Sequence, residues 1–250
     1  MTSVDEYAPG SFCWVENVTD DAAAAKAFYR EVMGWRIPGT SEFAMLSIER
    51  DPVGALYALP AAAWDGGARP HWLVYVATAD ARQTAARAHE LGGEVVREPF
   101  DTGGGWAAWL RDPQGALFGL WQAGSHPGAR RAGEPGTLCW PELGAEDPAA
   151  AAAFYGELFG WRPRESGSAA EPYTELDLDG TPSAGLRRPR PEAGAGWLPF
   201  FQVDDCDAAA GRTTAAGGRV LDPPTDHPGV GRMAVLADPR GAAFAVVRFG

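Results

Sequence analysis

Residues 13–35, "CWVENVTDDAAAAKAFYREVMGW", recur along the chain as residues 139–161, "CWPELGAEDPAAAAAFYGELFGW". The two passages align without a gap and are identical at 13 of 23 positions. The same spacing of 126 residues separates "DPQG" at 112–115 from "DPRG" at 238–241. Self-similarity at a fixed period is the signature of an internal duplication. We therefore interpret the chain as two copies of one structural unit.

Each copy has the pattern of a strand followed by a helix. Asp21 and Asp147 stand where a carboxylate can accept hydrogen bonds from the first N–H groups of a helix. Gly34 and Gly160 suit the left-handed residue that ends a helix. A second strand-and-helix pattern follows in each half, and each half ends with strands around its Asp-Pro-x-Gly turn. The sequence therefore predicts four βαβββ modules, two per half.

The segment 123–135 is rich in Gly and Pro and lacks apolar periodicity. Such a composition is typical of a linker. We predict a first domain over residues 8–122, a linker over 123–135 and a second domain over 136–250.

Composition and charge exclude several classes of protein. The formal net charge of −12 would repel nucleic acid phosphates. No stretch approaches the roughly 20 consecutive apolar residues of a membrane span, and the N-terminus lacks a secretory signal pattern. The three cysteines form no CxxC pair or Cys/His cluster, so we expect reduced thiols and no zinc. We therefore expect a cytoplasmic protein that binds neither nucleic acid nor membrane.

The pattern "D-x6-FY" ending in "GW", followed by a late "DP-x-G-x-x-F" hairpin, occurs in both halves. With these motifs the chain resembles the vicinal oxygen chelate superfamily, which includes glyoxalase I, bleomycin-resistance proteins, fosfomycin-resistance enzymes and extradiol dioxygenases. It is most similar to two-domain actinobacterial members labelled glyoxalase-like. The resemblance implies an α+β fold of tandem glyoxalase-like domains, with two cup-shaped mixed sheets and helices outside. It is also compatible with a homodimer.

The resemblance further implies a divalent metal held by His, Gln or Glu on the first and last strands of the modules. The first-strand positions fall on Trp14 and Trp140, and the last-strand positions fall on Gly119 and Ala245. Of the later first-strand positions, the first half offers His71. Indole and alkyl groups do not bind a divalent ion, and one His is too few ligands. We therefore expect no metal and no other cofactor.

Alternate residues of a strand share a face, so Trp14 and Glu16 are expected to point together into the first cup, and Trp140 and Glu142 into the second. Cys13 is expected to face the helix. Each cup would then present an aromatic surface beside a carboxylate, which suits a planar, partly cationic organic ligand. Alternatively, the indoles pack as core, and a neighbouring arginine such as Arg111 or Arg248 neutralises the carboxylates.

Further candidates follow from alternation along the later strands. His71 is a candidate acid–base or hydrogen-bonding group, or else a structural histidine. The Gly-rich segment 100–106 is interpreted as a mobile lid that carries Trp106. The ligand-binding candidates besides Trp14 and Trp140 are Tyr75, Trp106, Trp121, Phe200 and Gln202.

Three functions remain in view. The first is metal-free binding of a small aromatic or cationic organic molecule, as in the bleomycin-resistance branch that the chain resembles. The second is a cofactor-independent enzyme with Glu16, Glu142 or His71 as general base. The third is a metal-dependent lyase, isomerase or dioxygenase that uses unusual ligands such as Glu16 and His71. In each case the expected partner is a small organic molecule.

Overall fold

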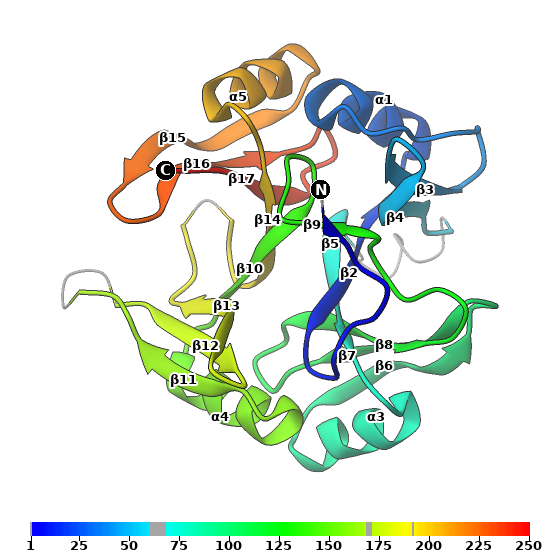
Figure 1. Cartoon of the computed structure of the whole chain (residues 1–250), viewed down its shortest axis with the longest axis vertical. Coiled ribbons are helices and arrows are strands. Elements are labelled where there is room, and N and C mark those ends of the chain that lie inside the picture. The colour runs from blue at the N-terminus through cyan, green and yellow to red at the C-terminus, as the bar shows by residue number, and fades with distance from the viewer. Residues whose placement is uncertain (1, 61–68, 169–171, 192) are drawn as a thin grey trace.

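The computed structural model describes residues 2–60, 69–168, 172–191 and 193–250. These residues form a seven-stranded and an eight-stranded mixed sheet, a two-stranded ribbon and four helices (Figure 1). The α+β fold that the resemblance implies is confirmed. Neither sheet is closed into a barrel, and each one curves around a hollow face.

The first sheet is built entirely from the first half of the chain. Its strand order is β3-β4-β2-β5-β8-β7-β6. At its centre β2 runs parallel to β4 and antiparallel to β5, and β5 runs parallel to β8. The elements are β2 (Phe12–Thr19), α1 (Ala22–Met33), β3 (Phe43–Ile48), β4 (Asp51–Ala58), β5 (His71–Ala77), α3 (Ala81–Glu90), β6 (Glu94–Asp101), β7 (Gly105–Arg111) and β8 (Leu117–Ala123).

The second half repeats this arrangement with one extra strand. Its strand order is β11-β12-β13-β10-β14-β17-β16-β15, so each half pairs its own two modules and no strand crosses over. The elements are β10 (Leu138–Gly144), α4 (Pro148–Phe159), β11 (Arg162–Glu165), β12 (Thr174–Leu178), β13 (Thr181–Arg187), β14 (Gly196–Gln202), α5 (Cys206–Ala215), β15 (Arg219–His227), β16 (Gly231–Ala237) and β17 (Ala243–Phe249).

The repeated helices begin and end where the sequence predicts. The Asp21 carboxylate accepts a hydrogen bond from the Ala24 N–H at 3.0 Å, and the Asp147 carboxylate accepts one from Ala150 at 3.1 Å. Gly34 and Gly160 adopt left-handed conformations, with φ of 69° and 76°. The capping signals in the two copies are therefore confirmed.

The two halves share one hydrophobic core. It joins the helix-covered faces of both sheets, whereas the hollow faces contain two separate, smaller apolar clusters. Helix α1 of the first half lies beside α5 of the second, and α3 lies beside α4 (Figure 1). The helix-covered faces thus pack toward each other, and each hollow face has its own interior.

The repeated Phe-Tyr and Asp-Pro-x-Gly motifs bind each other across the two halves. The Tyr29 hydroxyl donates to Asp238 Oδ2 at 3.0 Å, and the Tyr155 hydroxyl donates to Asp112 Oδ2 at 3.2 Å. Both tyrosines in turn accept a hydrogen bond from an indole N–H, from Trp72 at 2.9 Å and from Trp197 at 3.0 Å. The four hydrogen bonds form two equivalent buried connections between the halves.

The repeated Gly-Trp pairs form a second set of reciprocal hydrogen bonds between the two halves. The Trp35 indole N–H donates to the Gly136 carbonyl at 2.8 Å, and that of Trp161 donates to the Gly10 carbonyl at 2.9 Å. In both cases a tryptophan after the first helix of one half binds the chain just before the first strand of the other. These residues of the repeated motif therefore serve the assembly of the fold.

The predicted linker 123–135 is fastened to the first half. Its residues β9 (Arg131–Ala132) pair with β1 (Thr2–Ser3). The Arg131 side chain is 5% exposed and forms ion pairs with Glu49 at 2.6 Å and Asp51 at 2.8 Å. The Gly- and Pro-rich segment 123–135 is therefore held against the first half by these contacts.

None of the helices in the described part of the chain is long and apolar enough to span a membrane.

We predict that Tyr29→Phe lowers the free energy of unfolding by about 1–3 kcal/mol, because it leaves a buried Asp238 oxygen and the Trp72 N–H poorly satisfied. In a chain of this length that corresponds to a melting temperature lower by roughly 2–4 °C per kcal/mol. Tyr155→Phe should have a similar effect. Thermal unfolding followed by circular dichroism measures this, with Tyr57→Phe on a hollow face as control. Equal melting temperatures for Tyr29→Phe and the control would contradict the prediction.

Candidate functional site

The first strand of each half contains a bulge just before its tryptophan. Phe12 pairs with Val76 and Trp14 with Tyr75, so Cys13 has no partner of its own in the register. The prediction that Cys13 faces the helix is wrong, because the bulge turns its buried side chain into the apolar cluster of the hollow face. Trp14 and Glu16 do share that face. The second half has the same bulge between Leu138 and Trp140.

The hollow face of the first sheet holds a cavity of about 360 Å³, which we call the first cup. It is lined by Trp14, Glu16, Phe43, Met45, Ala55, Tyr57, Tyr75, Arg97, Phe100, Thr102, Gly104, Ala107, Trp109, Trp121 and His126.

Glu16 stands at the centre of a hydrogen-bond chain in the first cup. Its Oε2 accepts from the Tyr75 hydroxyl at 2.6 Å, and its Oε1 accepts from the Trp14 indole N–H at 3.3 Å. The Tyr75 oxygen accepts in turn from the Trp109 N–H at 2.8 Å. Burial raises the pKa of Glu16, and these hydrogen bonds together with the nearby charge of Arg97 oppose the rise. Both carboxylate oxygens therefore have partners within the protein.

A cation already occupies the aromatic wall of the first cup. The Arg97 guanidinium carbon lies 3.5 Å from the centroid of the Phe100 ring and 4.9 Å from that of Trp109. Trp109 also stacks on Tyr57, at 6.0 Å between centroids. The cation–π position that the sequence suggested for a ligand is thus filled in this cup by the protein's own arginine.

The hollow face of the second sheet holds a cavity of about 550 Å³, which we call the second cup. It is lined by Trp140, Glu142, Ser166, Gly167, Ser168, Pro172, Tyr173, Glu175, Pro182, Arg187, Arg190, Phe200, His227, Pro228, Gly229, Val230, Met233, Val247 and Phe249.

The carboxylate of the second cup is neutralised by an arginine. Glu142 is 4% exposed and accepts from Arg190 Nε at 2.7 Å and from Arg190 Nη2 at 3.2 Å. Asp222 lies 3.8 Å from the same guanidinium. An arginine thus neutralises Glu142, but it is Arg190 and not Arg111 or Arg248, which the sequence suggested. The Trp140 indole donates instead to the Tyr173 hydroxyl at 2.8 Å.

Neither cup fits the divalent metal that the resemblance implies. At the level of Trp14, the Tyr75 ring covers Gly119 so closely that a Cβ there would lie 2.3 Å from Tyr75 Cδ1. In the second cup, the neighbours of Trp140 at this level are Phe200 and Ala245. Indole, phenyl and methyl groups do not coordinate divalent ions. Within the described ranges, no three His, Cys, Asp or Glu side chains gather as a metal site.

Several of the predicted site residues do line the cups. Trp14, Glu16, Tyr75 and Trp121 lie around the first cup. Trp140, Glu142 and Phe200 lie around the second.

Three predicted residues lie elsewhere. Trp106 points to the helix-covered face, where the Arg82 guanidinium lies 4.7 Å from its ring centroid, because Ala107 and Trp109 take the cup-facing positions of that strand. His71 is outside the cavity lining, and its Nδ1 lies 2.7 Å from the Arg69 carbonyl oxygen. Burial lowers the pKa of His71. Gln202 does not line the second cup.

The predicted lid is a hydrogen-bonded hairpin turn. Thr102 N–H donates to the Gly105 carbonyl at 2.9 Å, and the Gly104 carbonyl accepts from the N–H groups of Gly124 and His126 at 3.0 Å each. A Cβ at Gly105 would lie 2.4 Å from the Gln122 carbonyl oxygen, so this glycine serves a close approach of two strands. The mobile-lid interpretation is therefore not supported by this packing.

Several side chains that line the cups are only weakly indicated by the sequence. Alternation from Ala107 identifies Trp109, but nothing local identifies Arg97 or Arg190 as the charges beside the two glutamates. His126 comes from the predicted linker, and its Nε2 is buried without a hydrogen-bond partner among the described residues. The cup residues that were missed include Tyr57, Arg97, Trp109, His126, Tyr173, Arg187 and Arg190.

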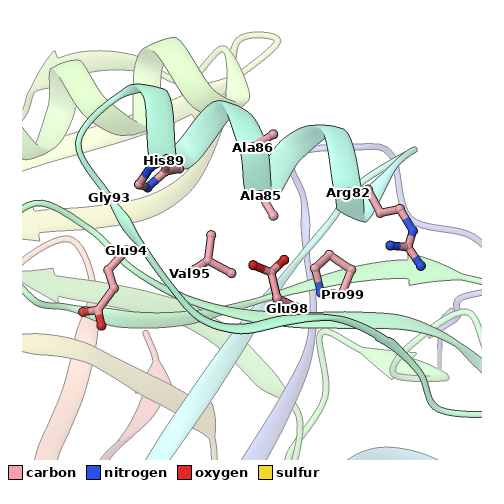
Figure 2. A pocket seen from close by; sticks show the side chains of 9 residues that line it. All are labelled: Arg82, Ala85, Ala86, His89, Gly93, Glu94, Val95, Glu98 and Pro99. Atoms are coloured by element: carbon pink, nitrogen blue, oxygen red, sulfur yellow. The ribbon is translucent and has the colours of Figure 1, made fainter.

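A third cavity, of about 530 Å³, lies outside both cups between α3 and β6. Figure 2 shows that Ala85 and Ala86 of the helix and Val95, Glu98 and Pro99 of the strand line it. The described residues that line this groove include no Phe, Tyr or Trp. It therefore lacks the stacking surfaces found in the two cups.

Comparison with known proteins agrees with this geometry. The family model described as Glyoxalase/Bleomycin resistance protein/Dioxygenase superfamily matches residues 12–120, and a glyoxalase-like domain model matches residues 142–247. A Mycobacterium tuberculosis protein named provisionally as a glyoxylase, CFP32, is 37% identical over 99% of this chain and 98% of its own length. The chain belongs to this superfamily.

Other relatives extend the comparison. The anthracycline biosynthesis protein DnrV of Streptomyces peucetius is 34% identical over 96% of this chain and 94% of its own length. Among solved structures, the Mn(II)-bound glyoxalase of Novosphingobium aromaticivorans superposes with a TM-score of 0.68 at 17% identity, covering 96% of this chain and 82% of that one. At that identity the superposition shows a shared fold.

The Glu142–Arg190 pair yields a prediction on stability. Arg190→Met leaves a buried carboxylate without its partner and should lower the free energy of unfolding by about 3 kcal/mol. Adding Glu142→Gln to this variant should restore part of the loss, because the uncompensated charge is gone. Urea unfolding of both single variants and the double variant measures the coupling. Additive losses would show that the two side chains act independently.

The first cup yields a prediction on pH. Burial raises the pKa of Glu16 in the folded protein above its ordinary value of about 4.5, so the folded state holds this proton more tightly than the unfolded state does. The free energy of unfolding therefore decreases as the pH rises above about 4.5 and Glu16 loses its proton. Glu16→Gln has no such dependence at this position. The melting temperature of Glu16→Gln relative to the unaltered protein should therefore increase between pH 4 and pH 7. A difference that stays constant with pH, or that decreases, would contradict the direction of this shift.

Proposed function

We propose that this protein binds a small aromatic organic molecule in the second cup without a metal ion. The observation that carries the proposal is an open cavity of about 550 Å³ with Trp140, Phe200 and Met233 on its walls. Ligand sites of this volume, with aromatic walls and a few polar groups, are typical of small-molecule binding. The polar groups at the Trp140 end are the hydroxyl of Tyr173 and the Glu142–Arg190 pair.

The first cup supports this choice by contrast. It is smaller, at about 360 Å³, and Arg97 covers its aromatic wall. Both oxygens of Glu16 accept hydrogen bonds from the protein. We therefore assign the first cup a supporting role and place the ligand in the second.

The relatives favour an aromatic ligand. Two Streptomyces relatives are named as anthracycline biosynthesis proteins, and anthracyclines are fused-ring aromatic compounds. The superfamily name also includes bleomycin resistance proteins, which matches sequestration of an organic molecule. A ligand with a planar ring system would find stacking surfaces on Trp140 and Phe200.

The enzymatic alternative has less support from the geometry. Glu142 forms an ion pair with Arg190, and His71 lies outside both cavity linings. Both oxygens of Glu16 accept hydrogen bonds within the protein. A general base must reach the proton that it removes, and it must be free to take it. None of the three residues meets both conditions in this arrangement, so we propose binding as the primary function.

The test uses a simple anthraquinone, 1,4-dihydroxyanthraquinone, as probe. Trp140→Ala should raise the dissociation constant about 10-fold, because a stacked aromatic contact contributes roughly 1–1.5 kcal/mol. Isothermal titration calorimetry measures this without relying on tryptophan emission. Trp14→Ala, the equivalent change in the first cup, is the matched control and should leave the dissociation constant unchanged. EDTA should have no effect on either measurement.

Three outcomes would count against the proposal. Equal affinity in Trp140→Ala and the unaltered protein would remove the second cup as the site. Weaker binding of the probe in Trp14→Ala alone would place the ligand in the first cup. Weaker binding on addition of EDTA would indicate that a metal ion takes part.

A further inference from the structure

We infer that Arg187 binds an acidic oxygen of the ligand, so that the second cup selects planar aromatic acids such as aromatic carboxylates or acidic hydroxyquinones. This inference rests on the proposed function of the second cup and adds the charge of the ligand to it.

Arg187 stands on the cup-facing side of β13. Two residues earlier on the same face, Gly185 lies beneath Tyr173 and Trp140, since a Cβ there would come within 1.7 Å of the Tyr173 hydroxyl and 2.8 Å of the Trp140 indole nitrogen. Alternate strand residues share a face, and Arg187 is part of the cavity lining. Its guanidinium is therefore placed beside the aromatic wall on which a ring would stack.

The other strong charges around this cavity are already paired. Glu142 pairs with Arg190, and the Glu175 carboxylate pairs with Arg164. Arg187 differs from them: its Nε is buried without a hydrogen-bond partner, and it takes part in no ion pair among the described residues. A buried donor on a charged group without a partner is costly, so this position has one unused cationic binding group.

Guanidinium chemistry defines what would satisfy this group. Its planar arrangement of N–H donors matches a carboxylate, and the charge-assisted hydrogen bonds are stronger than neutral ones. A cationic ligand would instead meet the positive charge of Arg187, which has no ion-pair partner among the described residues of this cavity. The lining therefore favours an acidic aromatic molecule over the cationic one that the Trp–Glu pairs suggested from sequence.

The duplication did not copy this feature. In the first half, Glu16 of β2 lies opposite Ala55 of the parallel strand β4. In the second half, Glu142 of β10 lies opposite Gly185 of the parallel strand β13. The position equivalent to Arg187 is thus Tyr57, which stacks on Trp109 in the first cup. A residue retained only to support the common scaffold would have no reason to change from an aromatic ring to a cation.

The experiment compares two probes with the same ring system: anthraquinone-2-carboxylate and the uncharged 2-(hydroxymethyl)anthraquinone. The full chain should bind the acid at least 10-fold more tightly than the alcohol, by calorimetry at pH 7. Arg187→Met should weaken binding of the acid at least 10-fold and change that of the alcohol less than about 3-fold. Arg187→Lys should give an intermediate value for the acid. Arg188→Met, which alters the exposed neighbour, is the matched control and should behave as the unaltered protein.

The results separate this inference from the proposed function. Equal affinity for the acid and the alcohol in the unaltered protein would overturn the role of Arg187 while leaving aromatic binding in place. Equal weakening of both probes in Arg187→Met would also overturn it, because it would indicate a general disturbance of the cup. Binding of neither probe would overturn both proposals. Retained binding of the alcohol in Arg187→Met shows that the variant is folded.

Discussion

The hydrogen bonds from Tyr29 to Asp238 and from Tyr155 to Asp112 determine how the whole molecule is assembled. In Asp238, Oδ1 accepts from the N–H groups of Arg240 and Ala242 at 2.9 Å each, which closes its own turn. Oδ2 is left to accept from the Tyr29 hydroxyl of the other half. Burial raises the pKa of Asp238, and these donors oppose the rise. Each carboxylate thus joins the last hairpin of one half to the first helix of the other, which packs the helix-covered faces together.

Because both connections lie in the shared core, the cups are free to differ. The Trp–Glu pair is present in each half, yet Glu16 accepts from Tyr75 whereas Glu142 pairs with Arg190. The duplication has kept the residues that assemble the scaffold and has changed those around the carboxylates. Repetition in this chain therefore identifies the fold, and the differences between the halves are the basis of the site that we propose.

Much of the fold could be predicted because its signals are local. The helix caps at Asp21 and Asp147 depend on neighbouring residues only, and so do the turns after the Asp-Pro motifs. The orientation of Cys13 could not be predicted, since a bulge changes which residues face the cup and leaves no composition signal. Arg187 and Arg190 were missed for a different reason. Arg187 is the last residue of β13 and Arg190 follows that strand, so neither residue belongs to the motifs that the two halves share.

The binding that we propose has a different physical basis from binding through a metal ion. A metal site draws its affinity from several oxygen or nitrogen ligands that converge on one ion. Here the equivalent level is filled by Trp14 and Tyr75 in one cup and by Trp140 and Phe200 in the other. Affinity must then come from burial of aromatic surface, which is weakly directional, so orientation has to come from a separate charged group. In the second cup, we propose that the Arg187 guanidinium, which has no ion-pair partner among the described residues, supplies this orientation at the edge of the aromatic wall.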